Sequence, residues 1–170
     1  MKRNASTLIL VLIFFVGLSV LLYPTISDYW NAKTQSKAIV DYDAALAALK
    51  PEDYSALFEA AEAYNAQLWA DGVTLRTPLD ELNRALYNSL LNINNTGVMG
   101  YITIEKIKVE LPVYHGTSEA ILNVAVGHLE NTSLPIGGEG THSVLSAHRG
   151  LPSAKLFTSL DRLAEGDTFT

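Results

Sequence analysis

A long uncharged stretch near the N-terminus constrains the fold of this chain more than any other feature. No charged residue occurs in residues 4–27, and residues 8–23 are almost wholly apolar. Such a stretch lies at the short end of the roughly 17–25 residues that cross a bilayer as a helix. Because Lys2 and Arg3 precede it, the positive charges predict a cytoplasmic N-terminus and an extracellular remainder.

A cleaved signal peptide is the competing interpretation, because the apolar core is short. Signal peptides end in a small-residue cleavage site of the Ala-x-Ala kind, whereas this stretch ends in the sequence LLYPTISDYW. We therefore predict an uncleaved membrane anchor over residues 1–27. The chain is then a single-pass protein of the cell membrane with an extracellular domain.

Charge and cysteine content exclude several classes of protein. The 170 residues include 12 Lys and Arg against 18 Asp and Glu, which gives a net charge of −6 without a basic patch. Nucleic acid is therefore not an expected partner. The chain has no cysteine, so it contains no disulfide, Cys-ligated metal or thiol nucleophile. We expect neither a metal nor a cofactor.

Residues 28–95 are expected to be helical. A first run ends near Leu49, and a second begins with Pro51 at its first helical position and stops at Asp71-Gly72. A third run is predicted to start at Thr77 as the N-cap, followed by leucines at helical spacing. We interpret this region as an amphipathic helical stalk that packs on the following domain.

The periodicity changes to two after residue 95. Ile102 and Ile104, and then Ile107 to Val113, alternate with polar residues, as in half-buried strands. Short apolar segments at residues 124–129 and 143–147 predict further strands, and a helical turn is expected at residues 118–123. Residues 96–170 thus form a mainly β domain. Its four or five strands are too few to close a barrel or sandwich.

The four histidines are the candidate acid–base groups. For His115, His128 and His142 a structural or solvated role is the simpler interpretation. His142 and His148 would lie about 20 Å apart on one strand, which argues against a two-histidine metal site.

His148 has the context of a catalytic group. It ends an apolar run and precedes Arg-Gly-Leu-Pro, so it is predicted at a strand end that faces a cleft. A serine nucleophile is not supported, because Ser146 lies on the same strand and no G-x-S-x-G motif occurs.

Residues 96–169 resemble the N-terminal part of the catalytic domain of class C sortases, the pilus-assembling cysteine transpeptidases of Gram-positive bacteria. The matching segments are residues 97–102 (GVMGYI), 111–119 (LPVYHGTSE), 126–130 (VGHLE), 132–138 (TSLPIGG) and 141–157 (THSVLSAHRGLPSAKLF). The last segment is long and specific, and the anchor and helical stalk also fit the layout of the family.

The resemblance implies a sortase-type barrel of about eight strands, incomplete here, with His148 as the catalytic histidine. A cysteine of the family attacks an LPxTG-like sorting signal on a pilin or other surface protein. A lysine amine of the next pilin then forms an isopeptide bond. The family's cysteine and arginine lie beyond the position of Thr170, so the chain is expected to be a fragment that is inactive alone.

Class C sortases usually carry a lid with an Asp-Pro-aromatic motif. The corresponding segment here is Thr77, Pro78 and Leu79, without the carboxylate and the ring, which predicts a weaker or differently built lid. Trp69 is a nearby substitute, although a structural tryptophan is the simpler interpretation.

Two alternatives remain open from the residues. One is a non-catalytic, membrane-tethered module that keeps sortase-like strands for binding or scaffolding. The other, a class A-type sortase, is disfavoured by the 148–157 segment and by the helical N-terminal region.

Overall fold

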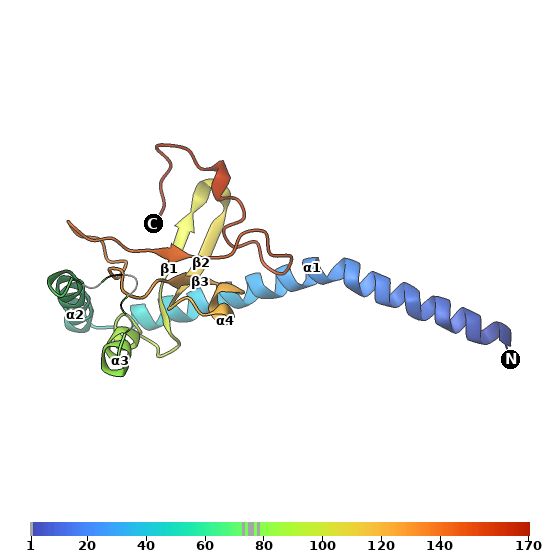
Figure 1. Ribbon diagram of the computed structural model, residues 1–170. Coiled ribbons are helices and arrows are strands. Elements are labelled where there is room, and N and C mark those ends of the chain that lie inside the picture. Colours follow the sequence, from blue (N-terminus) through green and yellow to red (C-terminus); the bar gives the residue numbers. More distant parts are fainter. Residues whose placement is uncertain (1, 73, 75–76, 78) are drawn as a thin grey trace.

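The computed structural model describes residues 2–72, 74, 77 and 79–170 (Figure 1). Its first element is one unbroken helix, α1 (Lys2–Ala47), which contains Pro24. None of residues 5–27, all of which the structure describes, is buried. Figure 1 shows this part of α1 projecting away from the other elements. The helix is long and apolar enough to cross a membrane.

The second half of α1 packs against the sheet. Ile39 and Tyr42 are buried there, and the Tyr42 hydroxyl donates to the carbonyl of Met99 over 3.1 Å. The predicted helix end near Leu49 is confirmed, because α1 ends at Ala47. The helix also runs through residue 27 without interruption, so the division into an anchor and a stalk stays a prediction.

Helices α2 (Pro51–Ala70) and α3 (Glu81–Ser89) lie together at the end of the domain remote from the projecting helix (Figure 1). Helix α2 begins with Pro51 and ends before Asp71, as predicted. The predicted N-cap at Thr77 is wrong. Asp80 caps α3 instead, because its carboxylate accepts the Asn83 N–H over 2.8 Å.

The sheet has four strands in the order β1-β2-β3-β4. They are β1 (Val98–Ile104), β2 (Val109–His115), β3 (Val126–His128) and β4 (Leu145–Ser146). The pair β2–β3 is parallel, and the two outer pairs are antiparallel. The sheet is open, so the expected sortase-type barrel is present only as this partial sheet.

Three short helical turns complete the fold: η1 (Glu105–Ile107), α4 (Glu119–Leu122) and η2 (Leu160–Arg162). Helix α4 confirms the turn predicted at residues 118–123. Thr170 exchanges backbone hydrogen bonds of 2.7 and 3.0 Å with Thr103 of β1, as a neighbouring antiparallel residue would.

The core lies between the sheet and the helices α2 and α3. Tyr64 of α2 and Tyr87 of α3 pack with apolar residues of all four strands and of the segments after β3 and β4. The buried strand residues of this core are Met99, Ile102, Ile104, Val109, Leu111, Val113 and Val126. Strand β4 contributes Leu145, which is half-buried. This packing fixes the helices over one end of the sheet.

Candidate functional site

His148 lies two residues after the end of β4, near the strand end at which the sequence predicts it. Its side chain is exposed, and the imidazole makes no hydrogen bond to the residues that the structure describes. The backbone is held in place, because the His148 carbonyl accepts the Phe157 N–H over 3.2 Å. The neighbouring Arg149 pairs with Asp161 over 3.2 Å. His148 is thus a solvent-accessible imidazole on a fixed backbone.

His115 has a structural role, as predicted. It is buried at the end of β2, with Nδ1 3.0 Å from the carbonyl of Gly97 and Nε2 2.8 Å from that of Leu90. The ring therefore ties the 90–97 loop to the sheet. Because both nitrogens are occupied, His115 is not available to a substrate.

His128 is also structural, and it is fully buried on β3. Its Nε2 lies 2.9 Å from the Ser133 carbonyl and its Nδ1 lies 2.9 Å from the Tyr87 hydroxyl. Nε2 must carry the proton, because a carbonyl only accepts, so Nδ1 accepts from Tyr87. Burial lowers the pKa of His128, which keeps the ring neutral.

Tyr87 joins α3 to His128 of β3 and to Gly116, the residue that follows β2. Besides contacting His128, its hydroxyl accepts the backbone N–H of Gly116 over 3.0 Å and lies 3.1 Å from the His128 carbonyl. Burial is the main cause of its raised pKa, so the hydroxyl stays protonated. No local pattern in the sequence marks this tyrosine, whose partner His128 lies 41 residues away.

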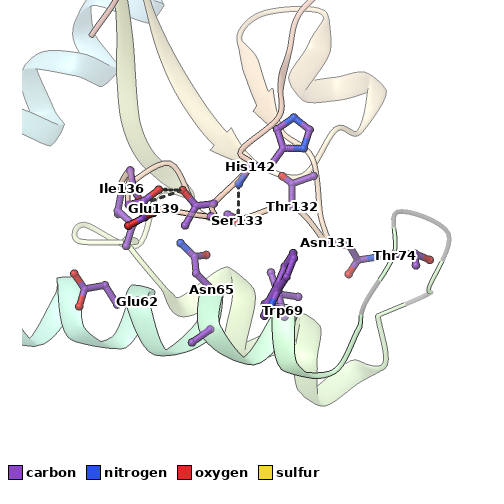
Figure 2. A pocket seen from close by; sticks show the side chains of 16 residues that line it. Glu62, Asn65, Trp69, Thr74, Asn131, Thr132, Ser133, Ile136, Glu139 and His142 are labelled. Atoms are coloured by element: carbon purple, nitrogen blue, oxygen red, sulfur yellow. Dashed lines mark hydrogen bonds between the residues drawn. The ribbon is translucent and has the colours of Figure 1, made fainter.

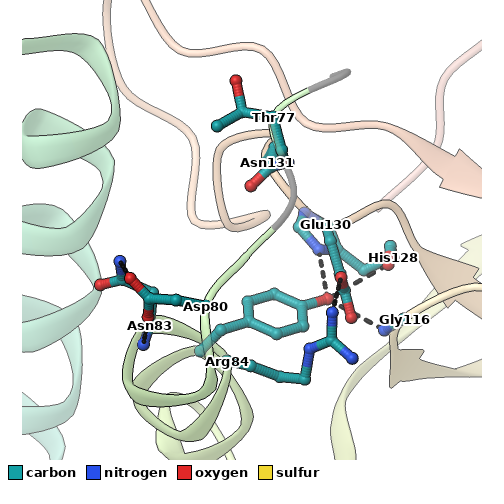
Figure 3. Close-up of polar contacts among 9 residues, drawn as sticks. Thr77, Asp80, Asn83, Arg84, Gly116, His128, Glu130 and Asn131 are labelled. Carbon is teal, nitrogen blue, oxygen red and sulfur yellow. Dashed lines mark hydrogen bonds and ion pairs between the residues drawn. The ribbon is translucent and has the colours of Figure 1, made fainter. Parts of the chain in front are cut away.

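The lid-like segment lies between α2 and α3, above the loop that follows β3. The Thr77 carbonyl accepts the Asn131 side-chain N–H over 2.5 Å, and Leu79 packs against the core. Pro78 lies outside the described residues. Behind the segment, Arg84 of α3 is 3.9 Å from Glu130 (Figure 3). Arg84 is exposed and Glu130 is half-buried, so this long ion pair contributes little to stability.

A cavity of about 1120 Å³ opens between α2 and the β3–β4 loop (Figure 2). Asn65 fixes the distance between its two walls, because its amide donates to the Leu134 carbonyl over 3.3 Å and accepts the Leu134 N–H over 2.7 Å. The lining includes Trp69, Glu62 and His142. Thr74, three residues before the lid-like segment, also lines the cavity.

The interpretation of Trp69 as a structural tryptophan in the core is wrong. Its side chain is 83% exposed and stands in the cavity rather than in the core. His142 also lies at the cavity rim, so the structure does not bring it together with His148. Among the described residues, no three His, Asp or Glu side chains are grouped in a way that could hold a metal ion.

Comparison with known proteins identifies the family. The model of the sortase domain matches residues 102–170. Sortase C1 from Streptococcus agalactiae is 47% identical, with a TM-score of 0.74, over 79% of this chain and 68% of that one. Clostridium perfringens sortase C, solved with the C-terminal cell wall sorting motif, is 42% identical, with a TM-score of 0.63, over 79% and 67%. Streptococcus pneumoniae sortase C is 35% identical, with a TM-score of 0.64, over 78% and 66%.

The chain therefore belongs to the class C sortases. It spans about two thirds of the length of these solved relatives. No curated protein matches it. Its 170 residues contain no cysteine, so the nucleophile implied by the family is not among them.

Proposed function

We propose that this chain is the histidine-bearing part of a membrane-anchored cysteine transpeptidase. The enzyme cleaves an LPxTG-like sorting signal and joins pilin subunits through a lysine isopeptide bond. One observation carries the proposal: His148 is an exposed imidazole on a fixed backbone, within a chain that is 47% identical to a sortase C1. The sorting motif in the Clostridium perfringens structure supports the class of substrate.

In the proposed reaction, a thiolate attacks the Thr–Gly carbonyl of the signal. The protonated imidazole of His148 gives its proton to the leaving amine, and a thioester remains. The neutral amine of a pilin lysine then attacks the thioester carbonyl, the neutral imidazole of His148 takes the amine proton, and the C–S bond breaks to release the thiolate. Since the 170 residues contain no cysteine, the proposal requires a thiol, and with it the supporting arginine, from outside them. His148 alone cannot form the thioester.

We propose that the Thr77–Leu79 segment is a lid without the usual carboxylate and ring. Its bond to Asn131 and the packing of Leu79 support a fixed resting position beside the β3–β4 loop. In the protein with its cysteine, a Thr77→Asp/Leu79→Phe variant should slow thiol labelling by restoring the usual motif. Unchanged labelling would contradict this lid assignment.

The localisation follows from α1. We propose that residues 1–27 cross the cell membrane once and leave residues 28–170 outside. The unbroken apolar helix and the absence of burial along residues 5–27 support an anchor. Lys2 and Arg3 then remain on the cytoplasmic side.

A non-catalytic sortase-like module is the second candidate, and the absence of cysteine favours it. The two candidates differ in the protein recovered from native membranes. A mass well above 18.5 kDa together with one reactive thiol supports the enzyme. A mass equal to that of the 170 residues excludes it.

Activity is tested on that native protein with a sorting-signal peptide and a lysine acceptor. His148→Ala should abolish acyl transfer, and added imidazole should restore part of it. Glu110→Gln, an exposed change on β2, is the matched control and should leave the rate unchanged. Full activity of His148→Ala would refute the assigned role.

A further inference from the structure

One face of the domain meets α1 at the residue where the apolar stretch ends. Asp28 is the first charged residue after that stretch. Its carboxylate accepts the Lys155 backbone N–H over 3.0 Å and lies 3.5 Å from the Lys155 ammonium. Three residues on, the Asn31 side chain donates to the Ser153 carbonyl over 2.8 Å. The loop after His148 is therefore fastened to the first turn of α1 beyond the apolar stretch.

The same stripe of α1 continues into the domain. Gln35 donates to the Val124 carbonyl over 2.6 Å, and Ile39 and Tyr42 are buried one and two turns further on. Residues spaced by three and four lie on one side of a helix. One side of a single unbroken helix thus holds the domain from Asp28 onward. No flexible linker separates the apolar part of α1 from the domain.

The dimensions place this junction at the membrane surface. Residues 8–27 rise about 30 Å as a helix, which equals the hydrocarbon thickness of about 30 Å. Asp28 and the attached 153–155 loop then lie at the level of the lipid headgroups. Tyr23, Tyr29 and Trp30 are largely exposed at this level, where tyrosine and tryptophan concentrate in membrane proteins.

The charges near the junction differ from those of the rest of the domain. Lys2 and Arg3 are two of the twelve cations, so residues 28–170 carry ten against eighteen Asp and Glu, a net charge of −8. Yet Lys33 and Lys37 on α1 are exposed, without an ion pair to any described residue, and the Lys155 side chain is 86% exposed. The acidic Asp41 and Asp43 follow only further along the helix.

We propose that the membrane-proximal end of the domain rests on the anionic headgroups of the outer leaflet, with the 153–155 loop on one side of α1 and Lys33 and Lys37 on the other. The proposal assumes the membrane anchor of the proposed function. Its consequence concerns His148. Phe157, bonded to the His148 carbonyl, is two residues from Lys155, so His148 lies within about 15 Å of Asp28. The imidazole is held at a fixed, short height above the lipid.

The absence of native cysteine makes single-cysteine labelling a direct test. The full chain is placed in nanodiscs and labelled with a fluorophore at Pro152→Cys, beside the fastened loop, or at Glu59→Cys on α2. Both sites are exposed. Headgroup-nitroxide lipids should quench the label at 152 and leave the label at 59 almost unaffected. Equal quenching at both sites would overturn the proposal.

Changes in lipid composition and in the charge of α1 test whether anionic headgroups bind the domain. Quenching at 152 should be stronger in phosphatidylglycerol discs than in phosphatidylcholine discs. Each lysine near an anionic surface favours it about fivefold, so Lys33→Gln/Lys37→Gln should remove most of the difference. Asp41→Ala, on the same helix, is the control and should not. Identical quenching in both lipids would also overturn the proposal.

Two further variants separate this proposal from the anchor. Asp28→Ala/Asn31→Ala should release the loop and reduce quenching at 152. A label at Val16→Cys should be quenched by acyl-chain nitroxides if α1 spans the bilayer. Failure at 16 refutes the anchor itself. Quenching at 16 without quenching at 152 refutes only the docked face.

Discussion

Removing a single oxygen, in Tyr87→Phe, should loosen the attachment of α3 to the sheet. The Tyr87 side chain is fully buried, and its hydroxyl serves both the Gly116 N–H and the His128 Nδ1. Phenylalanine keeps the ring packing but leaves both groups without a partner. An unsatisfied buried group costs about 1–3 kcal/mol, and Gly116 is only half-buried. We expect the free energy of unfolding to fall by about 2–3 kcal/mol.

The assay is urea unfolding of the full chain in detergent micelles, followed by circular dichroism. The micelle keeps the apolar half of α1 helical throughout, so the change in signal reports the domain. Tyr54→Phe is the matched control, because Tyr54 is 45% exposed and its hydroxyl has no hydrogen bond to a described residue. The control should stay within about 0.5 kcal/mol. A Tyr87→Phe effect as small as the control would refute the proposed network.

Three other changes test the packing around the sheet. Gly127→Ala should destabilise the domain by about 2–3 kcal/mol in the same urea assay, because a Cβ there would collide with the Gly116 carbonyl. Gly100→Ala is the control, because the space around Gly100 is open. Asn65→Ala should cost about 1–3 kcal/mol, because the buried Leu134 N–H loses its partner, whereas the Leu134 carbonyl keeps its bond from the Ile136 N–H. An unchanged urea midpoint would contradict this. The free energy of unfolding should also decrease as the pH falls below about 6.5. Below that pH His128 binds a proton in the unfolded chain, whereas its lowered pKa keeps it unprotonated in the folded protein. His128→Gln should flatten that part of the pH profile, and an equally steep profile would assign it to another group.

The helix boundaries show what local sequence determines. Pro51 and Asp71-Gly72 mark both ends of α2 because they act through the backbone of their own turn. At the start of α3, two candidate caps lie three residues apart. The Thr77 hydroxyl contacts Thr74, whereas the Asp80 carboxylate reaches the N–H of Asn83. The choice between them depends on tertiary position, which the sequence pattern does not contain.

The site residues also divide into those that the adjacent sequence identifies and those that only tertiary contacts identify. His148 was recognisable because its neighbours along the chain match the family motif, whereas its chemical role stays a prediction. The Tyr87–His128 and Asn65–Leu134 contacts join residues 41 and 69 positions apart. No periodicity predicts such pairs. The exposure of Trp69 was missed for a related reason, since its surroundings are created by the β3–β4 loop rather than by α2.

The β3–β4 loop connects the lid-like segment to His148. Residues of β3 and of this loop receive most of the polar contacts from the two covering helices and from the segment between them; the bond from Gly116 to Tyr87 is the exception described above. These contacts join Tyr87 to His128, Arg84 to Glu130, Thr77 to Asn131 and Asn65 to Leu134. The same loop leads into β4 and then to His148. A substitution in the loop should therefore displace the lid-like segment and the imidazole together. A change in a covering helix, such as Tyr87→Phe, alters the support of the lid-like segment, while β4 keeps its pairing with β3. Such a change should therefore affect the lid-like segment without displacing the imidazole of His148.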